Sequence, residues 1–187
     1  IATYAMLDHP KIEEIKKMPI KTLELDHIGI KAAQFSFSRL KGADPTLGVE
    51  MSSTGEVATF GDELHETLLK SLLSVGFTIP KKNILVTIGT EKDKIDLGES
   101  IKNLYELGYK IFATEGTHKA LRSLGVRSKL LHKMKSGLSP NIGDYIRNKK
   151  VDMVINIPRN FTPDEVTDGY LMRRRAIDAN IPLITNK

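Results

Sequence analysis

Residues 81–187 alternate between short apolar runs and segments with helical periodicity, and no other feature constrains the fold as strongly. The apolar runs are NILVTIG, YKIFAT, SKLLHKM, VDMVINIP and IPLITN. Short continuous apolar runs are typical of buried strands, and apolar residues repeated every three to four positions are typical of helices. Strands that alternate with helices pair in parallel, with helices on both faces of the sheet. We therefore predict an α/β unit with a five-stranded parallel sheet and flavodoxin-like layering.

The helices expected between these strands have definable ends. The first passes through Leu97, Ile101 and Leu104 and stops at Gly108, and the second covers residues 117–124 and closes at Gly125. A short helix is expected in NIGDYIRNKK and a longer one in TDGYLMRRRAIDAN.

The first 80 residues follow a different pattern. LDHIGIKAAQFSFSRL and LGVEMSSTGEVATFG are typical of strands and turns, and GDELHETLLKSLLSVG repeats leucines at helical spacing. Asp62 is expected to cap this helix, and Gly76 is expected to end it. We predict two domains, with residues 1–80 an α+β portion of a larger domain and residues 81–187 the α/β unit.

The composition is that of a soluble globular protein, with 40% hydrophobic and 27% charged residues. No apolar run is long enough to span a bilayer, and no signal peptide is evident. The absence of cysteine excludes disulfides and thiolate metal sites and fits a reducing compartment, so we expect a cytoplasmic location. Because the chain begins with Ile rather than Met, we expect a fragment or a processed piece.

The positive charge is concentrated in the second half of the chain. Of 28 Lys and Arg and 23 Asp and Glu, residues 1–80 hold 8 and 11, which leaves 20 and 12 in residues 81–187. A half with a net charge of +8 favours an anionic partner, although most lysines simply form a solvated surface.

Polar residues follow the predicted strands at their carboxyl ends, where ligands bind in open α/β sheets. They are Gly89, Thr90, Lys92, Lys94, Thr114, Gly116, Thr117, Lys133, Lys135, Ser136, Gly137, Asn156 and Arg159. A phosphate at a helix N-terminus is stabilised by free N–H groups and by the helix dipole. In this interpretation Gly116 allows close approach, Thr114 and Thr117 donate hydroxyl hydrogens, and lysines neutralise the charge. Alternatively, Thr117 only caps its helix and Thr114 only ends a strand.

Other motifs are weak. The five histidines lack metal-ligand spacing, and no Walker A or dinucleotide fingerprint occurs. The Arg run at 173–175 is expected to be an ion-paired helix face, and a nucleic-acid surface is the minor alternative because few aromatic residues accompany it.

Two groups of motifs carry a resemblance to a known family. KAAQFSFSRLKGADPTLGVEMSSTGEVATFG resembles the end of the second ATP-grasp unit of the carbamoyl phosphate synthetase large chain. IPKKNILVTIGT, ATEGT and VINIP resemble the allosteric domain of the same family, which has a methylglyoxal-synthase-like fold.

The resemblance implies a regulatory region of an ATP-dependent ligase. The intact enzyme makes carbamoyl phosphate from bicarbonate and glutamine or ammonia for pyrimidine and arginine synthesis. It uses ATP, Mg or Mn, and K, and it works with a glutaminase small subunit. For this fragment alone we expect no catalysis, cofactor, metal, nucleic acid or membrane. The expected partners are the rest of the large chain and a small anionic effector, namely UMP, IMP or PRPP (uridine or inosine monophosphate, or phosphoribosyl pyrophosphate).

Matched to the family, the effector residues of this chain are Lys94, Thr114, Thr117, Lys133 and Asn156, with Lys92 an alternative to Lys94. Gly116 joins the predicted site because it allows close approach of the ligand to the backbone. Pro158 departs from the bacterial nucleotide-binding pattern and is closer to the urea-cycle branch, which binds N-acetylglutamate. That branch has tryptophan at the position of Lys133 and asparagine at that of Arg159, and a cation at Lys133 favours a phosphate.

Two further hypotheses remain. The first is methylglyoxal synthase acting on dihydroxyacetone phosphate, for which Asp144 is the available base, although it fits better as part of a short helix. The second is a nucleic-acid binder that works through the basic half.

Overall fold

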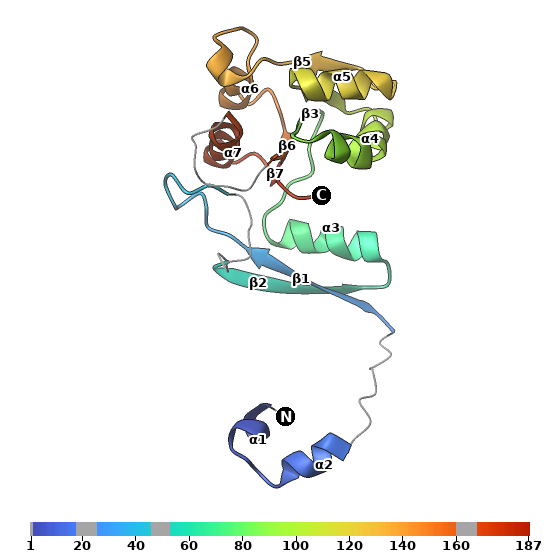
Figure 1. Cartoon of the computed structure of the whole chain (residues 1–187), viewed down its shortest axis with the longest axis vertical. Helices are drawn as coiled ribbons and strands as arrows, with labels where there is room; N and C mark the ends of the chain where they lie inside the picture. The colour runs from blue at the N-terminus through green and yellow to red at the C-terminus, as the bar shows by residue number, and fades with distance from the viewer. Residues whose placement is uncertain (1, 18–25, 46–52, 160–167) are drawn as a thin grey trace.

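A five-stranded parallel sheet organises the second half of the chain. The computed structural model describes residues 2–17, 26–45, 53–159 and 168–187. The sheet has the order β5-β4-β3-β6-β7, and all its neighbouring strands pair in parallel (Figure 1). Its strands are β3 (Asn83–Ile88), β4 (Lys110–Ala113), β5 (Ser128–Leu130), β6 (Met153–Ile157) and β7 (Leu183–Ile184). The predicted α/β class and five-stranded parallel sheet are confirmed.

Side chains from the central strands bury themselves on both faces. Ile84 and Val86 of β3 point into one cluster, whereas Leu85 of β3 and Val154 of β6 point into another, and all four are fully buried. Successive side chains of a strand face opposite sides, so a strand with helices on both sides must be apolar at every position. The continuous apolar runs in the sequence have this cause.

Two helices cover each face of the sheet. α4 (Glu91–Glu106) and α5 (Glu115–Ser123) contribute Ile101 and Leu121 to the first cluster. α6 (Ile142–Arg147) and α7 (Asp168–Asp178) contribute Ile142, Ile146, Met172 and Ala176 to the second. The predicted stops are confirmed, because Gly108 and Gly125 follow α4 and α5 with φ of 94° and 78°. A short 3-10 helix, η1 (Met134–Ser136), lies between β5 and α6.

An antiparallel hairpin and one helix precede the sheet. β1 (Ile28–Gln34) pairs with β2 (Gly55–Gly61) from Ile28↔Gly61 to Gln34↔Gly55, and α3 (Leu64–Ser74) lies against the hairpin. Gly76 ends α3 with a φ of 91°, as predicted. The prediction that Asp62 caps this helix is wrong, because the N-cap is Glu63, without a side-chain hydrogen bond.

Further segments complete the described structure. The helices α1 (Ala2–Met6) and α2 (Lys11–Lys17) come first in the chain. Residues 46–52 of the second predicted strand region lie outside the described residues, and the predicted domain boundary at residue 80 falls between α3 and β3. In the ranges that the structure describes, no helix is both long enough and apolar enough to cross a bilayer.

The strand order places a topological switch beside β3. The chain moves from β3 outward through β4 to β5, and then returns to the other side of β3 for β6 and β7. The loops after β3 and β6 lie against each other at the carboxyl edge, because a Cβ on Gly89 would stand 2.5 Å from the backbone nitrogen of Arg159. Open α/β sheets commonly bind ligands beside such a switch. The predicted site residues lie around this edge.

Candidate anion-binding site at the carboxyl edge

Lys94 of α4 reaches the first turn of α5. Its side chain is only 9% exposed, and its Nζ lies 2.5 Å from Glu91 Oε1. The same Nζ lies 3.3 Å from the position that a Cβ on Gly116 would occupy. The structure therefore brings the predicted residues Lys94 and Gly116 together. The alternative, Lys92, is exposed on α4.

The N-terminus of α5 has no side-chain cap. Thr114 is the N-cap residue, with an extended backbone (φ −72°, ψ 161°), but its hydroxyl does not accept from the helix. By contrast, Thr90 at the start of α4 accepts from the backbone N–H of Asp93 at 3.1 Å. The N–H groups of a first helical turn need partners from outside the helix. The first backbone N–H groups of α5 belong to the same helical turn that the Lys94 ammonium group approaches.

Thr117 is placed inside the fold. It is 1% exposed, and its Oγ1 accepts from the backbone N–H of Ile88 at 3.0 Å and lies 3.5 Å from the Ile88 carbonyl oxygen. This hydroxyl therefore ties α5 to the end of β3. A contact between Thr117 and an anion stays a prediction, and it would require the hydroxyl to exchange partners.

Asn156 of β6 is also buried, and both the nitrogen and the oxygen of its side-chain amide form hydrogen bonds. It is 5% exposed, its Nδ2 donates to Thr87 Oγ1 at 2.7 Å, and its Oδ1 accepts from Arg173 at 2.9 Å. Asn156 lies within β6, one residue before its end, and Arg173 was not predicted as a neighbour. A contact from Asn156 to an effector stays a prediction.

Lys133 lies exposed at the start of η1, beyond β5. Three strand spacings separate β5 from β6, so these two strands lie ~14 Å apart across the sheet at ~4.8 Å per spacing. Lys133 follows β5 and Asn156 belongs to β6, and contact of both residues with one effector stays a prediction.

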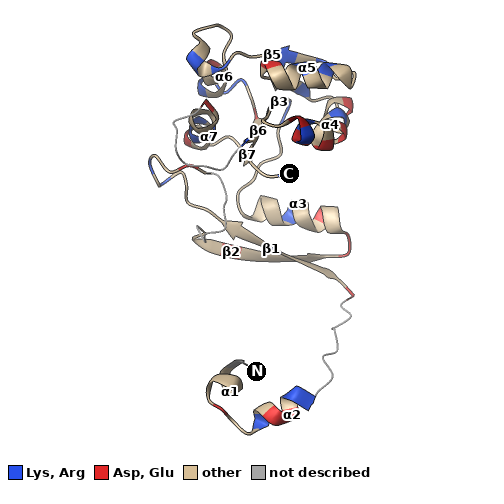
Figure 2. Cartoon of the chain, viewed as in Figure 1, with Lys and Arg blue, Asp and Glu red and all other residues tan. Residues whose placement is uncertain are grey.

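The acidic side chains of this edge are paired with lysines. Glu91 pairs with Lys94, and Asp93 pairs with Lys187 at 2.7 Å. Figure 2 shows acidic and basic residues side by side on α4. The hydrogen bond from Lys187, and then that from Thr90, lowers the pKa of the Asp93 carboxyl below its ordinary value. On α5, the bond from Lys119 lowers the pKa of Glu115 in the same way. Carboxylates that are already neutralised weaken the repulsion of an incoming anion.

The first two arginines of the run on α7 are ion-paired, as the sequence predicts, and they are also buried. Arg173 and Arg174 form ion pairs with Asp44 and Asp178, but the two arginines are only 6% and 8% exposed. Their burial leaves little of either guanidinium for a nucleic acid. A buried arginine requires partners for its five N–H groups, and sequence spacing does not reveal where those partners lie.

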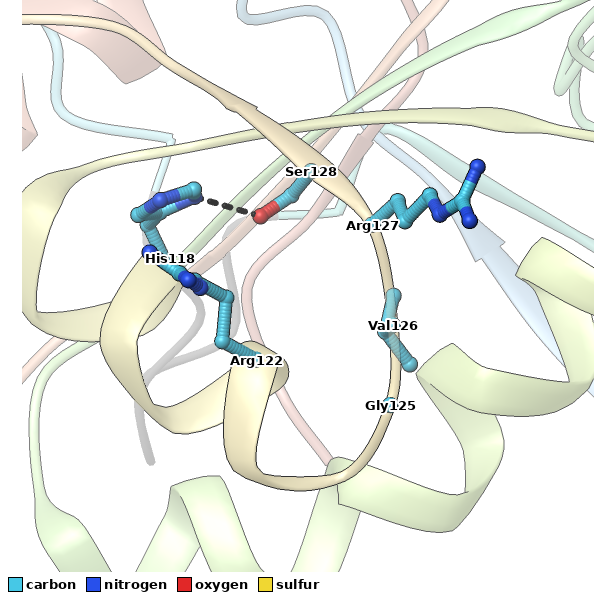
Figure 3. A pocket seen from close by; sticks show the side chains of 6 residues that line it. All are labelled: His118, Arg122, Gly125, Val126, Arg127 and Ser128. Atoms are coloured by element: carbon cyan, nitrogen blue, oxygen red, sulfur yellow. Dashed lines mark hydrogen bonds between the residues drawn. The ribbon is translucent and has the colours of Figure 1, made fainter.

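A separate concavity lies at the amino end of β5. Its cavity volume is about 350 Å³, and Figure 3 shows the lining residues His118, Arg122, Gly125, Val126, Arg127 and Ser128. His118 Nδ1 and Ser128 Oγ lie 2.8 Å apart in this pocket. The strands end on the opposite side, so this pocket is not the predicted site.

Asp144 and the possible metal ligands are the remaining candidates for chemistry. Asp144 lies in α6, as expected, where its Oδ2 accepts from Asn141 Nδ2 at 2.7 Å and its backbone N–H donates to Asn141 Oδ1 at 3.0 Å. Within the described ranges, no three His, Asp or Glu residues gather closely enough to hold a metal ion.

Known proteins share sequence with this chain along its whole length. Residues 96–185 match the family of MGS-like domains. This part of the chain is an MGS-like domain. The whole chain is 43% identical to the multifunctional protein URA2 of Saccharomyces cerevisiae, over 195 residues that make up 9% of that protein. Over 96% of its length it is 41% identical to the human mitochondrial carbamoyl-phosphate synthase [ammonia], of which it covers 11%. The resemblance to carbamoyl phosphate synthetases is confirmed.

Other matches extend the comparison. Over 84% of its length the chain is 43% identical to the multifunctional protein CAD of Squalus acanthias, of which it covers 8%. A crystal structure of methylglyoxal synthase from Elizabethkingia anophelis aligns with 58% of this chain and 74% of its own, at 20% identity and a TM-score of 0.45. The chain thus spans about a tenth of the length of the curated relatives that it matches.

Proposed function

We propose that this chain is a regulatory region of a carbamoyl phosphate synthetase and that its MGS-like domain binds a nucleotide or phosphoribosyl effector at the carboxyl edge. The similarity to synthetases along almost the whole chain supports this proposal. The intact enzyme would be a cytoplasmic ATP-dependent ligase that uses Mg or Mn, and K, and forms carbamoyl phosphate with ammonia from a glutaminase subunit. The candidate effectors are UMP, IMP and PRPP.

The placement of Lys94 carries the proposal. An ammonium group that is mostly buried faces the N-terminus of α5, where the helix dipole is already positive. Among the described residues, Lys94 forms an ion pair only with Glu91, whose side chain is 82% exposed. An ion pair with such an exposed carboxylate contributes little to the stability of the fold. An anion beside Lys94 and the first turn of α5 would compensate both positive charges. The Thr114 hydroxyl, which caps nothing, would be a further donor.

The extent of the edge favours an effector larger than a single phosphate. The strands β5 and β6 lie ~14 Å apart across the sheet, so a ligand that contacts residues after both strands has to be larger than one phosphate. A monophosphate held at Lys94 and Gly116 would direct its sugar toward one end of this edge. A ligand with a second phosphate would reach toward Lys133, which supports a phosphoribosyl pyrophosphate.

The domain would bind its effector without transforming it. Abstraction of a proton from dihydroxyacetone phosphate requires a carboxylate base within hydrogen-bond reach of the substrate. The Asp144 carboxylate is bonded to Asn141 in the first turn of α6. This favours a regulatory role over the methylglyoxal synthase alternative.

Calorimetric titration of the 187-residue chain with UMP, PRPP and N-acetylglutamate tests the proposal. We expect heat of binding with UMP or PRPP, and a loss of affinity of at least about tenfold, or 1.4 kcal/mol, in Lys94→Met. Lys110→Met is the matched control, because Lys110 is exposed at the start of β4, on the opposite edge of the sheet. Binding of N-acetylglutamate alone would replace the nucleotide assignment, and silence toward all three ligands by folded protein would refute the proposal.

A further inference from the structure

A chain of buried hydrogen bonds leads from the carboxyl edge to the first half of the molecule. Thr87 of β3 accepts from Asn156 at 2.7 Å, and Asn156 Oδ1 accepts from Arg173 at 2.9 Å. Arg173 Nε then donates to Asp44 Oδ1 at 2.8 Å, and a second guanidinium nitrogen donates to Asp44 Oδ2. Thr87, Asn156 and Arg173 are each about 95% buried. The chain thus joins residues that are 129 positions apart in the sequence.

Asp44 belongs to a segment that docks on α7, residues 37–45, which we name the docked segment. Arg174 donates to the carbonyl oxygens of Phe37, Leu40 and Ala43 at 3.0, 2.9 and 3.2 Å. The hydroxyl of Tyr170 donates to the Gly42 carbonyl at 2.7 Å. Figure 1 shows this segment leaving β1 and passing beside α7. One helix therefore holds the docked segment and also contacts the carboxyl edge.

Arg173 differs from its neighbour in what it connects. Arg174 binds the docked segment and Asp178 of its own helix, and both contacts would serve packing alone. Arg173 divides its guanidinium between Asp44 and the side chain of Asn156, whose amide is planar. Because the amide is rigid, rotation that takes Nδ2 away from Thr87 also moves Oδ1 away from Arg173. A buried guanidinium that loses one partner is destabilised until it finds another.

We propose that Arg173 is a positioning residue that couples the occupancy of the carboxyl edge to the placement of the docked segment. An anionic ligand that draws the Asn156 amide toward itself weakens the Asn156–Arg173 bond, and the Arg173–Asp44 pair readjusts. The ligand-driven part of this inference rests on the proposed function, whereas the connection between Asp44 and the end of β6 does not. Coupling of this kind is reciprocal, so a change at Asp44 must also alter ligand affinity.

Hydrogen exchange of the 187-residue chain without any ligand gives the first test. Asp44→Asn keeps the shape of the side chain but removes the charge that holds Arg173. We expect it to raise the exchange rates of the backbone amides of Asn156, Ile157 and Arg159 severalfold, since Pro158 has no exchangeable hydrogen. Asp178→Asn is the matched control, since it removes a carboxylate from the adjacent arginine without touching Asn156. Equal rates at Asn156, Ile157 and Arg159 in wild type and Asp44→Asn would overturn the inference.

UMP and PRPP supply the second test. We expect whichever of them binds to change the exchange of amides in residues 37–45, and Asp44→Asn to change its affinity by about fivefold or more. The Asp178→Asn control should keep the wild-type affinity. If a compound binds but changes neither the exchange at residues 37–45 nor its affinity in Asp44→Asn, the coupling is overturned and the proposed function stands. If neither compound binds, the proposed function fails, and the ligand-free comparison alone decides whether the coupling exists.

Discussion

The ammonium group of Lys94 lies 3.3 Å from the point where a Cβ on Gly116 would stand, so the side chain of one helix occupies the space left by a glycine in the next. This pairing joins α4 to the first turn of α5 and places a cation beside a helix N-terminus that no side chain caps. Because Gly116 has no Cβ, a ligand can approach the backbone of this turn, and the Lys94 side chain can pack against it. The same contact makes the proposed anion site sensitive to a single methyl group.

Gly116→Ala should separate binding from stability. Alanine is favoured over glycine within helices by up to about 1 kcal/mol, and the Lys94 side chain is flexible enough to move aside. We expect an unchanged or higher free energy of unfolding in urea, together with a loss of UMP or PRPP affinity of about tenfold. Wild-type affinity in this variant would contradict the placement of the phosphate at this turn.

Glu91→Gln should strengthen anion binding. Without a ligand, Glu91 Oε1 forms an ion pair with Lys94 Nζ at 2.5 Å. An incoming phosphate therefore has to compete with the Glu91 carboxylate for this ammonium group. Removing this charge should raise the affinity about two- to fivefold, the scale of an exposed ion pair. Glu99→Gln on the same helix removes an equal charge from an exposed position and is the control. Equal gains in both variants would indicate a general charge effect, and calorimetry distinguishes the two outcomes.

Gly89→Ala should destabilise the carboxyl edge itself. A Cβ at this position would lie 2.5 Å from the backbone nitrogen of Arg159 and 2.8 Å from its Cα, and the backbone cannot yield as a side chain does. We expect a loss of about 1–3 kcal/mol in the free energy of unfolding. Gly55→Ala is the control, because nothing lies within 4 Å of the corresponding Cβ in β2. Urea denaturation of both variants gives the measurement. Equal unfolding midpoints would show that the loop after β3 is not in contact with the loop after β6.

Lys187→Ala should change how stability depends on pH. In the folded chain the hydrogen bond from Lys187 lowers the pKa of Asp93 below its ordinary 3.8, so the stabilisation is present above 3.8 and is lost as the pH falls through the folded value. The bonds to Asp93 and Asp96 raise the pKa of Lys187 above its ordinary 10.5. The stabilisation that Lys187 contributes is fully present below pH 10.5. It is lost as the pH rises through the pKa of Lys187 in the folded chain.

Wild type should therefore exceed Lys187→Ala in thermal midpoint across the neutral range, and the difference should shrink in acid and in strong alkali. Thermal unfolding from about pH 3 to 11 measures it, with Lys81→Ala as a control for the removal of an exposed lysine. A difference that stays constant below pH 4 would show that Asp93 is not the partner that matters.

Much of the MGS-like domain follows from local sequence signals. Buried strands require continuous apolar runs and helix ends favour glycine, so β3, β6 and the stops at Gly108 and Gly125 were predictable. The approach of Lys94 to the start of α5 was also within reach, because parallel strands bring their carboxyl ends to one edge. Asp62 failed as a cap because Glu63 takes the cap position in the turn between β2 and α3.

The amino-acid sequence alone specified the alternation of strands and helices, the basic half of the chain and the gathering of polar groups at one edge. The folded chain added the partners of those groups: Ile88 for the Thr117 hydroxyl, Thr87 and Arg173 for Asn156, and Asp44 for Arg173. Periodicity reports which face of an element is apolar, but a buried polar atom takes its partner from wherever the chain returns. For Arg173 that partner lies 129 residues away, beyond the range of any local pattern.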